Sequence, residues 1–340
     1  MKIAILDDYQ NATVALKSFA ILHGHDVKVF NNTTRGLGQL AIRLAPFDAL
    51  VLIRERTALN RALLTKLPNL KLISQTGKLA GHVDVAAATE LGIAIAEGVG
   101  SPIAPAELTW ALIMAAARKI VPYANNLRDG LWQTASINPQ LNGLGFVLRG
   151  RTLAIWGYGR IGQLVAGYGR AFGMRVLVWG SETSRNRAVA DGYTAAASRE
   201  AFFAEADVLS LHLRLNEATR AIVTADDLAR MQPGALFVNT SRAELVAADA
   251  LEAALLRGRP GYAALDVFNA EPLGADAPLL RIPTVLATPH LGYVERDSYE
   301  LYFQHAFQNL VDFAAGKYDA IHNPAFQDQA HGRALRPAAG

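Results

Sequence analysis

The 340-residue sequence predicts an α/β fold built from two doubly wound parallel-sheet domains. Short apolar runs rich in Val, Ile, Leu and Ala alternate with helix-like stretches, which is typical of parallel strands covered on both faces. The alternation occurs in two series, one within the first 100 residues and one from Arg151 onward. Because a chain of this length exceeds most single cores, two domains are the natural expectation.

The elements of the two series follow the same order of strand and helix. In the first series we expect strands at KIAILD, DVKVF, DALVLI and LKLISQTG, with helices at NATVALKSFAIL and RALLTKL. In the second we expect strands at TLAIWG, RVLVWG, DVLSLHL, ALFVNTS, YAALDVF and TVLATPH. A helix is predicted after each series. One starts near Pro102, and the other covers RDSYELYFQHAFQNLVDFAAGK and ends at Gly316.

Composition excludes several classes of protein. Apolar residues make up 51% and charged residues 19%, and the formal charge is only +3 despite a pI of about 9.1. No basic run interleaved with aromatics is present, so we expect no nucleic-acid partner. There is no cysteine, and the longest apolar region, LTWALIMAAA, is too short to span a membrane. Without a recognisable signal peptide, the expected location is the cytoplasm.

A glycine-rich stretch, GYGRIG, joins a predicted strand to a predicted helix. The spacing of Gly157, Gly159 and Gly162 is that of a dinucleotide-binding loop, where glycines allow a tight turn and a close approach of the pyrophosphate. The helix N-terminus adds partial positive charge. The alternative is a glycine-rich turn in an ordinary βα unit. The predicted cofactor-binding residues of this loop are Gly157, Tyr158, Gly159, Arg160, Ile161 and Gly162.

The next predicted strand lacks the acid that usually holds the ribose of NAD. It ends in Gly180 and Ser181, where an Asp or Glu is expected. Ser181 and Thr183 offer hydrogen bonds, and Arg185, with Arg187 beyond it, offers charge for a 2′-phosphate. This pattern favours NADP(H) over NAD(H). Two alternatives remain open: Glu182 holds the ribose, or the arginines are solvated surface charges.

Three later strands end in polar residues. The stretches NTSRAELV, LDVFNAEPL and TPHLGYVE carry Arg242, Asp266, Glu271 and His290. In a doubly wound sheet the strand C-termini face the ligand crevice. Reduction of a 2-oxo acid requires a cation for the carboxylate and a proton donor for the new alkoxide. An Arg and a His beside an acid meet these needs.

These ordered motifs resemble those of the D-isomer-specific 2-hydroxyacid dehydrogenases, over roughly residues 45–315. The resemblance implies hydride transfer between a nicotinamide cofactor and C2 of a small D-2-hydroxy or 2-oxo acid. Arg242 would bind the substrate carboxylate, Glu271 would hold His290, and His290 would move the proton. Asp266 would orient the carboxamide. The further cofactor contacts it implies are His212, Thr240 and Gly292, and Arg214 replaces a common Pro as a second candidate for a 2′-phosphate.

The resemblance also assigns roles to the two domains and a cleft between them. Residues 1–100 with 294–330 would form a flavodoxin-like substrate domain, residues 101–293 a Rossmann nucleotide domain, and residues 331–340 a tail. The loop QTGKLAGHVD would bind the substrate carboxylate through backbone N–H groups of Gly77, Lys78 and Leu79, with Arg54 nearby. Lys78 either contacts a distal anionic group or is solvated. Dimers through the region 101–145 are expected, and no metal is.

Two other functions share this fold. Dinucleotide-sensing corepressors keep similar residues, so a binding module is the main alternative to an enzyme. A redox-silent relative is the third hypothesis. The complete set of Arg242, Glu271 and His290 favours the enzyme.

Overall fold

The computed structural model describes residues 1–134, 138 and 142–323. The chain forms two compact units. The first contains Met1–Ser101 and the chain from Glu295 onward, and the second is Pro102–Val294. The tail predicted at 331–340 lies outside the described residues. Within the described part, none of the helices has the length and apolar character needed to cross a bilayer.

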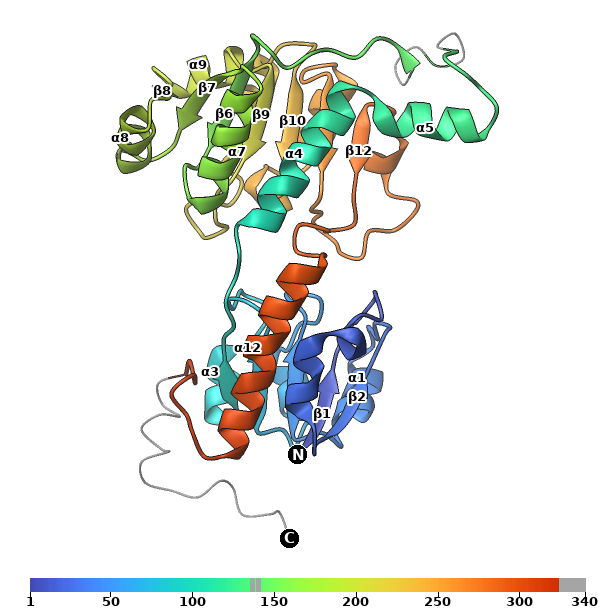
Figure 1. Cartoon of the computed structure of the whole chain (residues 1–340), viewed down its shortest axis with the longest axis vertical. Helices are drawn as coiled ribbons and strands as arrows, with labels where there is room; N and C mark the ends of the chain where they lie inside the picture. The colour runs from blue at the N-terminus through green and yellow to red at the C-terminus, as the bar shows by residue number, and fades with distance from the viewer. Residues whose placement is uncertain (135–137, 139–141, 324–340) are drawn as a thin grey trace. The chain divides into compact units, whose positions relative to one another are not determined.

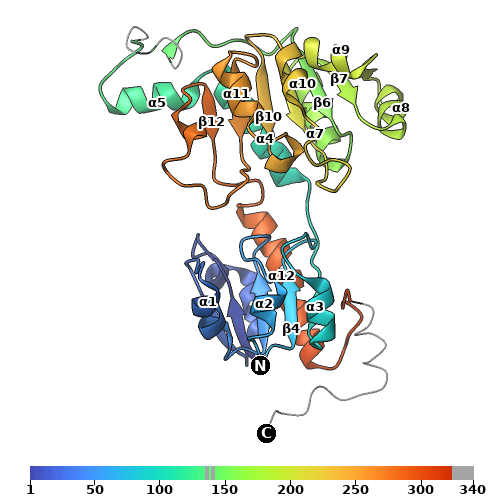
Figure 2. The ribbon, with the colours of Figure 1, turned by 180° about the vertical axis from the view of Figure 1, so that it is seen from behind.

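The first unit is built on a five-stranded parallel sheet with the order β2-β1-β3-β4-β5, which is the flavodoxin-like order. Helices α1 to α3 cover one face of the sheet (Figure 2), and α12 covers the other (Figure 1). Its elements are β1 (Lys2–Ile5), η1 (Thr13–Ala15), η2 (Lys17–Leu22), β2 (Asp26–Val29), α1 (Leu37–Leu44), β3 (Ala49–Leu52), α2 (Arg61–Leu64), β4 (Leu72–Gln75), α3 (Val85–Glu90), β5 (Ala94–Ala96) and α12 (Arg296–Ala314).

Burial explains why the strands of this unit are continuous apolar runs. The residues of β3 and β4 are buried on both faces of the sheet, as parallel strands between helix layers require. On the α12 face, Phe303 and Phe307 are fully buried and stack at 5.3 Å between ring centroids. Helix α12 ends before Gly316, whose φ of 77° only glycine adopts easily.

The prediction of an α-helix at residues 11–22 of the first unit is wrong. The stretch 11–22 forms two short 3-10 helices in place of one α-helix. The Asp8 carboxylate accepts from the N–H groups of Ala12 and Thr13, which turns the chain at once after β1. Leu16 is then extended, with ψ of 143°, so no continuous helix forms.

The second unit is built on a seven-stranded parallel sheet with the order β12-β11-β10-β9-β6-β7-β8. Counted from β6, this is the Rossmann order with one strand added beyond the sixth. Its elements are α4 (Ile103–Ala117), α5 (Ile120–Arg128), β6 (Thr152–Trp156), α7 (Arg160–Ala171), β7 (Arg175–Trp179), α8 (Glu182–Ala190), β8 (Thr194–Ala195), α9 (Arg199–Ala204), β9 (Val208–Leu211), α10 (Ala225–Arg230), β10 (Leu236–Asn239), η3 (Ala243–Leu245), α11 (Ala250–Leu256), β11 (Tyr262–Leu265), η4 (Pro278–Arg281) and β12 (Val285–Ala287).

Two hydrophobic cores lie on the two faces of this sheet. One joins α4 and α7 to the sheet, and the other joins α9, α10 and α11 to it. Figure 1 shows α4 and α7 on the near face, and Figure 2 shows α10 and α11 on the opposite one. The cores fix the strands, so the loops at the strand C-termini start from rigid positions. The sheet order reverses between β6 and β9, and nucleotides bind at such switch points.

Candidate active site

The glycine-rich turn follows β6 and leads into α7. Gly157 has a φ of 102°, and a Cβ there would come within 2.6 Å of the His212 carbonyl oxygen. A Cβ at Gly162 would lie 2.2 Å from the Gly157 carbonyl oxygen, so the helix packs directly on the turn. Gly159 precedes α7. Apart from its neighbours in the chain, none of the described residues lies within 4 Å of the position that a Cβ would take there. An open backbone at a helix N-terminus fits the pyrophosphate of a dinucleotide.

Tyr158 stabilises this turn through both its side chain and its backbone carbonyl group. Its side chain is buried, and the hydroxyl donates to Asp191 Oδ2 at 2.8 Å. Its carbonyl oxygen accepts from Gln163 Nε2 at 3.1 Å, and its ring meets that of Tyr193 edge-on. Burial and the bond to Asp191 raise the pKa of Tyr158 well above its usual range, so the hydroxyl remains a donor. The side chain therefore fixes the backbone of a loop that was predicted from the sequence to bind the cofactor.

The end of β7 is the region predicted to select the nucleotide. Ser181 is the N-cap of α8, and its hydroxyl oxygen accepts from Ser184 N at 3.3 Å. Thr183 lies exposed in the first turn of α8. The Arg185 guanidinium lies 4.7 Å from the centre of the Trp179 ring, which fixes its position at the strand end. The side chains are thus grouped around one short helix N-terminus.

The residues after β9 and β10 complete the predicted cofactor contacts. His212 Nε2 lies 2.9 Å from Ser210 Oγ, and burial lowers the pKa of His212 to about 4, so the ring is neutral at physiological pH. The hydroxyls of Thr240 and Thr109 share a hydrogen bond of 2.7 Å, which ties β10 to α4. Arg214 is exposed on the loop after β9.

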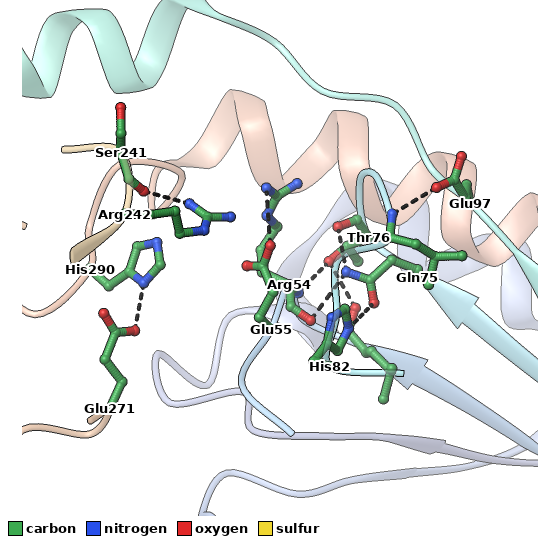
Figure 3. Close-up of polar contacts among 12 residues, drawn as sticks. Arg54, Glu55, Gln75, Thr76, His82, Glu97, Ser241, Arg242, Glu271 and His290 are labelled. Atoms are coloured by element: carbon green, nitrogen blue, oxygen red, sulfur yellow. Dashed lines mark hydrogen bonds and ion pairs between the residues drawn. The ribbon is translucent and has the colours of Figure 1, made fainter. Parts of the chain in front are cut away.

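A turn built by Asn239 presents Arg242. Asn239 Oδ1 accepts from Ser241 N at 3.0 Å, and Asn239 Nδ2 donates to the Arg242 carbonyl oxygen at 2.8 Å. Ser241 Oγ donates to the Leu211 carbonyl oxygen at 2.7 Å, which secures the turn to the neighbouring strand. Arg242 Nη1 donates to the Ser241 carbonyl oxygen at 2.6 Å. Figure 3 shows the guanidinium on the side of the loop that carries His290, and its charge acts on Glu271, the partner of His290.

Asp266 is fully buried at the end of β11 and holds the segment after β12. Its Oδ1 accepts from Thr288 Oγ1 and Leu291 N, both at 2.7 Å, and its Oδ2 accepts from Gly292 N at 2.9 Å. Burial raises the pKa of Asp266, although these hydrogen bonds oppose the shift. A carboxylate offers about four acceptor positions, so three protein bonds leave room for one more donor. The visible role of Asp266 is to position the segment that carries His290.

His290 and Glu271 meet as the sequence motifs implied. His290 Nδ1 lies 2.6 Å from Glu271 Oε2, and Glu271 Oε1 accepts from Phe268 N at 2.9 Å (Figure 3). Burial would raise the pKa of Glu271, but the bond and charge of His290, helped by the Phe268 N–H and the charge of Arg242, lower it. Glu271 is therefore ionised at neutral pH. His290 has a φ of 54°, a left-handed conformation that is uncommon for residues other than glycine.

The predicted substrate residues lie in the first unit, after β3 and β4. A Cβ at Gly77 would come within 1.9 Å of Arg54 Nη1, so the guanidinium lies directly against this glycine. Arg54 has a φ of 53°, and Thr76 Oγ1 accepts from its N–H at 2.9 Å. Lys78 Nζ donates to Glu97 Oε2 at 2.8 Å. Among the described residues, the N–H groups of Gly77 and Lys78 have no acceptor.

One predicted substrate contact requires correction. The N–H of Leu79 donates to Glu97 Oε1 at 2.7 Å, so it is not open to a substrate carboxylate. Glu97 follows β5, and parallel strands bring their C-terminal ends to one edge, which places it beside the loop after β4. No signal in the sequence predicted this contact, nor the side-chain roles of several residues: Glu97, Tyr158, Asp191, Asn239, Ser241 and Thr288.

Comparison with known proteins agrees with the fold. Residues 110–292 match the NAD binding domain model of the D-isomer specific 2-hydroxyacid dehydrogenases. A glyoxylate reductase of Aeropyrum pernix is 39% identical over 259 residues, which is 75% of this chain and 76% of that protein. The crystal structure of an oxidoreductase from Ralstonia solanacearum has a TM-score of 0.94 and 56% identity, covering 98% of this chain and 99% of that one. The structure of a phosphoglycerate oxidoreductase from Vibrio cholerae O395 is also 56% identical, with a TM-score of 0.88, covering 93% and 99%.

The chain belongs to the D-isomer specific 2-hydroxyacid dehydrogenase family. It is therefore a hydroxyacid oxidoreductase with a Rossmann domain for a nicotinamide cofactor. The comparisons give no support to the corepressor alternative.

Proposed function

We propose that the protein reduces a small 2-oxo acid to the D-2-hydroxy acid, with His290 as the proton donor. The observation that carries this proposal is the 2.6 Å contact between His290 Nδ1 and the ionised Glu271. With Nδ1 held by the carboxylate, Nε2 is the ring nitrogen that remains for the substrate oxygen. Arg242, whose charge acts on Glu271, binds the substrate carboxylate and polarises the carbonyl.

The proposed reaction needs the protein only for position, charge and one proton. When bound, the nicotinamide supplies the hydride that C2 of the substrate receives. The electron pair of the C=O bond moves to oxygen, which takes the proton from Nε2 of His290 and leaves the imidazole neutral. Glu271 stabilises the protonated ring before the transfer and keeps its orientation. In the oxidative direction, the neutral ring accepts the proton from the hydroxyl.

Asp266 and the first unit complete the proposed binding groups. The fourth acceptor position of Asp266 suits the carboxamide of the nicotinamide, while its other bonds keep His290 in place. In the first unit, Arg54 and the N–H groups of Gly77 and Lys78 bind the substrate carboxylate. The names of the relatives leave the rest of the substrate open, since they include a glyoxylate reductase and a phosphoglycerate oxidoreductase.

We propose NADP(H) as the preferred cofactor. No acid stands at Gly180 or Ser181 to repel a 2′-phosphate, and Ser181 and Thr183 at the start of α8 offer hydrogen bonds. Stacking on Trp179 fixes Arg185 at the same strand end, where its charge attracts the phosphate, with Arg214 as a second cation. Steady-state kinetics with NADPH and NADH test this. We expect at least a tenfold higher kcat/KM for NADPH, from one charge-assisted contact; a preference for NADH would contradict it.

We propose that the protein forms a homodimer through α5 and the chain beside it. Figures 1 and 2 show α5 leaving the body of the second unit. Its apolar side chains are exposed, among them Ile120, Leu127 and, just beyond the helix, Trp132, of which 71% is accessible. An apolar surface of this kind marks an interface. Sedimentation should give a dimer for the native chain and a monomer for Leu127→Glu; a monomeric native chain would contradict the proposal.

The simplest test of the reaction is the absorbance of the reduced cofactor. Mixing the protein with NADPH and glyoxylate, or hydroxypyruvate, should oxidise the cofactor, whereas Arg242→Lys should do so poorly. Lys cannot reproduce the planar fork of Arg. Cofactor binding measured by fluorescence serves as the control, because Arg242 is not assigned to the cofactor. Full activity of Arg242→Lys would contradict the assigned role.

A further inference from the structure

The loops at the C-terminal ends of β3, β4 and β5 in the first unit carry charged side chains, four of which form ion pairs. Arg54 and Glu55 follow β3, Lys78 follows β4, and Glu97 follows β5. The three strands are neighbours in a parallel sheet, so their ends share one edge. Figure 3 shows the Glu97 carboxylate turned toward the loop that contains Lys78.

These four charges form two pairs of opposite sign. Lys78 Nζ lies 2.8 Å from Glu97 Oε2, and Arg54 Nη2 lies 3.9 Å from Glu55 Oε1. The side chains of Arg54, Glu55 and Glu97 are only 17–20% exposed, so solvent screens them weakly. These two pairs therefore carry no net formal charge before any substrate binds.

Glu97 is fixed in place by more than Lys78. Its Oε1 accepts from Leu79 N at 2.7 Å, and His322 Nδ1 lies 3.7 Å from Oε2. The Glu97 carbonyl oxygen accepts from Asn309 Nδ2 at 3.2 Å. Although burial opposes it, the bonds from Lys78 and Leu79 lower the pKa of Glu97, so the carboxylate stays charged at neutral pH. A substrate entering this loop meets a permanent negative charge.

A nearby cation, Arg56, keeps its charge, but protein groups already engage its guanidinium. Its Nη1 donates to the Asp7 carbonyl oxygen at 2.6 Å, and its Nη2 donates to Tyr299 Oη at 3.2 Å and Gln10 Oε1 at 3.3 Å. The guanidinium also covers the Tyr9 ring at 4.6 Å. Arg56 serves the packing of β3 against α12.

We propose that the first unit selects 2-oxo acids whose group beyond C2 is uncharged and discriminates against phosphorylated or dicarboxylic ones. This inference rests on the proposed function and on the loop after β4 binding the substrate. A single carboxylate suits the N–H groups of Gly77 and Lys78 beside Arg54. A second anionic group would face Glu55 and Glu97, with both local cations already paired. Like charges brought together in this way are a source of specificity against the wrong substrate.

The test compares two substrates that differ by one phosphate. Hydroxypyruvate and its 3-phosphate ester share the 2-oxo acid, so the ratio of their kcat/KM values isolates the distal group. We expect the ester to be about 100-fold poorer with the native chain. An ester turned over as well as hydroxypyruvate would overturn the inference and leave the proposed function intact. Turnover of neither, with no turnover of glyoxylate, would instead refute the proposed function, and the inference with it.

Glu97→Gln tests the cause of the discrimination. The amide oxygen can still accept from Leu79 N, but the negative charge beside Lys78 is gone. We expect the ratio of kcat/KM for the ester to that for hydroxypyruvate to rise about tenfold. The matched control is Glu90→Gln, which breaks an exposed pair with Arg61 in the same unit and should leave the ratio unchanged. A Glu97→Gln ratio equal to that of the control would overturn the inference, provided that thermal unfolding shows both variants folded.

Discussion

Glu271 in the second unit and Glu97 in the first make the same kind of contact with different results. Each carboxylate lies in the loop after a strand, β11 for Glu271 and β5 for Glu97, and is within 2.8 Å of a basic side chain. Glu271 holds a histidine, whose ring nitrogens can donate or accept a proton, whereas Glu97 holds a lysine, whose ammonium group can only donate. The basic side chain that each glutamate contacts therefore decides what the pair can do. In the proposed mechanism, the first pair positions the proton donor, and the second neutralises a charge at the edge proposed to bind the substrate.

The largest expected effect is the loss of the titratable partner in the second unit. His290→Ala removes the proton donor, and general acid catalysis contributes about 10²–10⁴-fold, so we expect kcat to fall about 1,000-fold. Cofactor affinity, measured by fluorescence quenching, should change little, since the phosphate loop is untouched. A fall of less than tenfold would show that Glu271 and His290 form no more than a structural pair.

A second histidine, His212, sharpens the contrast because its partner is a hydroxyl and not a carboxylate. Burial lowers its pKa in the folded state to about 4, below the value of about 6.5 expected when unfolded. Between these values the unfolded chain binds more protons, so stability falls as the pH drops from 6.5 toward 4. Relative to pH 7, the loss from this residue reaches up to about 3 kcal/mol.

Urea unfolding of the native chain and His212→Gln at pH 7 and pH 4.5 measures this effect. We expect the native chain to lose more free energy of unfolding between the two pH values than the variant does. The variant keeps a polar side chain but cannot take up the proton. Equal losses in the two proteins would show that His212 does not control the acid limb of stability.

Arg242→Lys is expected to have a smaller effect on kcat/KM, because charge is kept and only the fork is lost. A drop of about 30-fold corresponds to about 2 kcal/mol, the size of a charged hydrogen bond. Steady-state kinetics with glyoxylate measure it. Lys78→Gln in the first unit is the comparison, since Lys78 is already neutralised by Glu97. A larger loss for Lys78→Gln than for Arg242→Lys would reverse the roles assigned to the two units.

The smallest expected effect concerns the buried hydroxyl behind the phosphate loop. Tyr158→Phe keeps the ring packed but removes the donor to Asp191. A hydrogen bond contributes about 1 kcal/mol net, so the Kd for NADPH should rise about fivefold while kcat is kept. Fluorescence titration measures the affinity. An unchanged Kd, or a fall in kcat alone, would show that Tyr158 does not position the turn.

The sequence was most informative where one backbone turn or one strand end defines the structure. The need for glycine at positions 157 and 162 was predictable, because the atoms that a Cβ would meet belong to the same βα unit or to the loop after the adjacent strand. The meeting of His290 with Glu271 followed from motif order, since both lie after neighbouring strands of one sheet. The strand orders of both sheets follow the flavodoxin-like and Rossmann patterns that the family resemblance implied.

Contacts between strand ends that no motif identifies were not predictable. Nothing in the stretch AEGVG indicates that Glu97 takes the Leu79 N–H and neutralises Lys78. The stacking of Arg185 on Trp179 depends on the turn that Ser181 caps, and periodicity carries no information on it. The predicted α-helix at 11–22 failed because Leu16 is extended and divides the stretch into two short 3-10 helices, which the apolar periodicity does not indicate.

The central claim is that this chain reduces 2-oxo acids with His290 as the proton donor, and one measurement tests it most directly. The native protein is mixed with NADPH and hydroxypyruvate, and both cofactor oxidation and the chirality of the product are followed. The account predicts one D-glycerate formed for each NADPH oxidised, and a rate about 1,000-fold lower in His290→Ala. Formation of the L-isomer, or no oxidation although NADPH is bound, would contradict it.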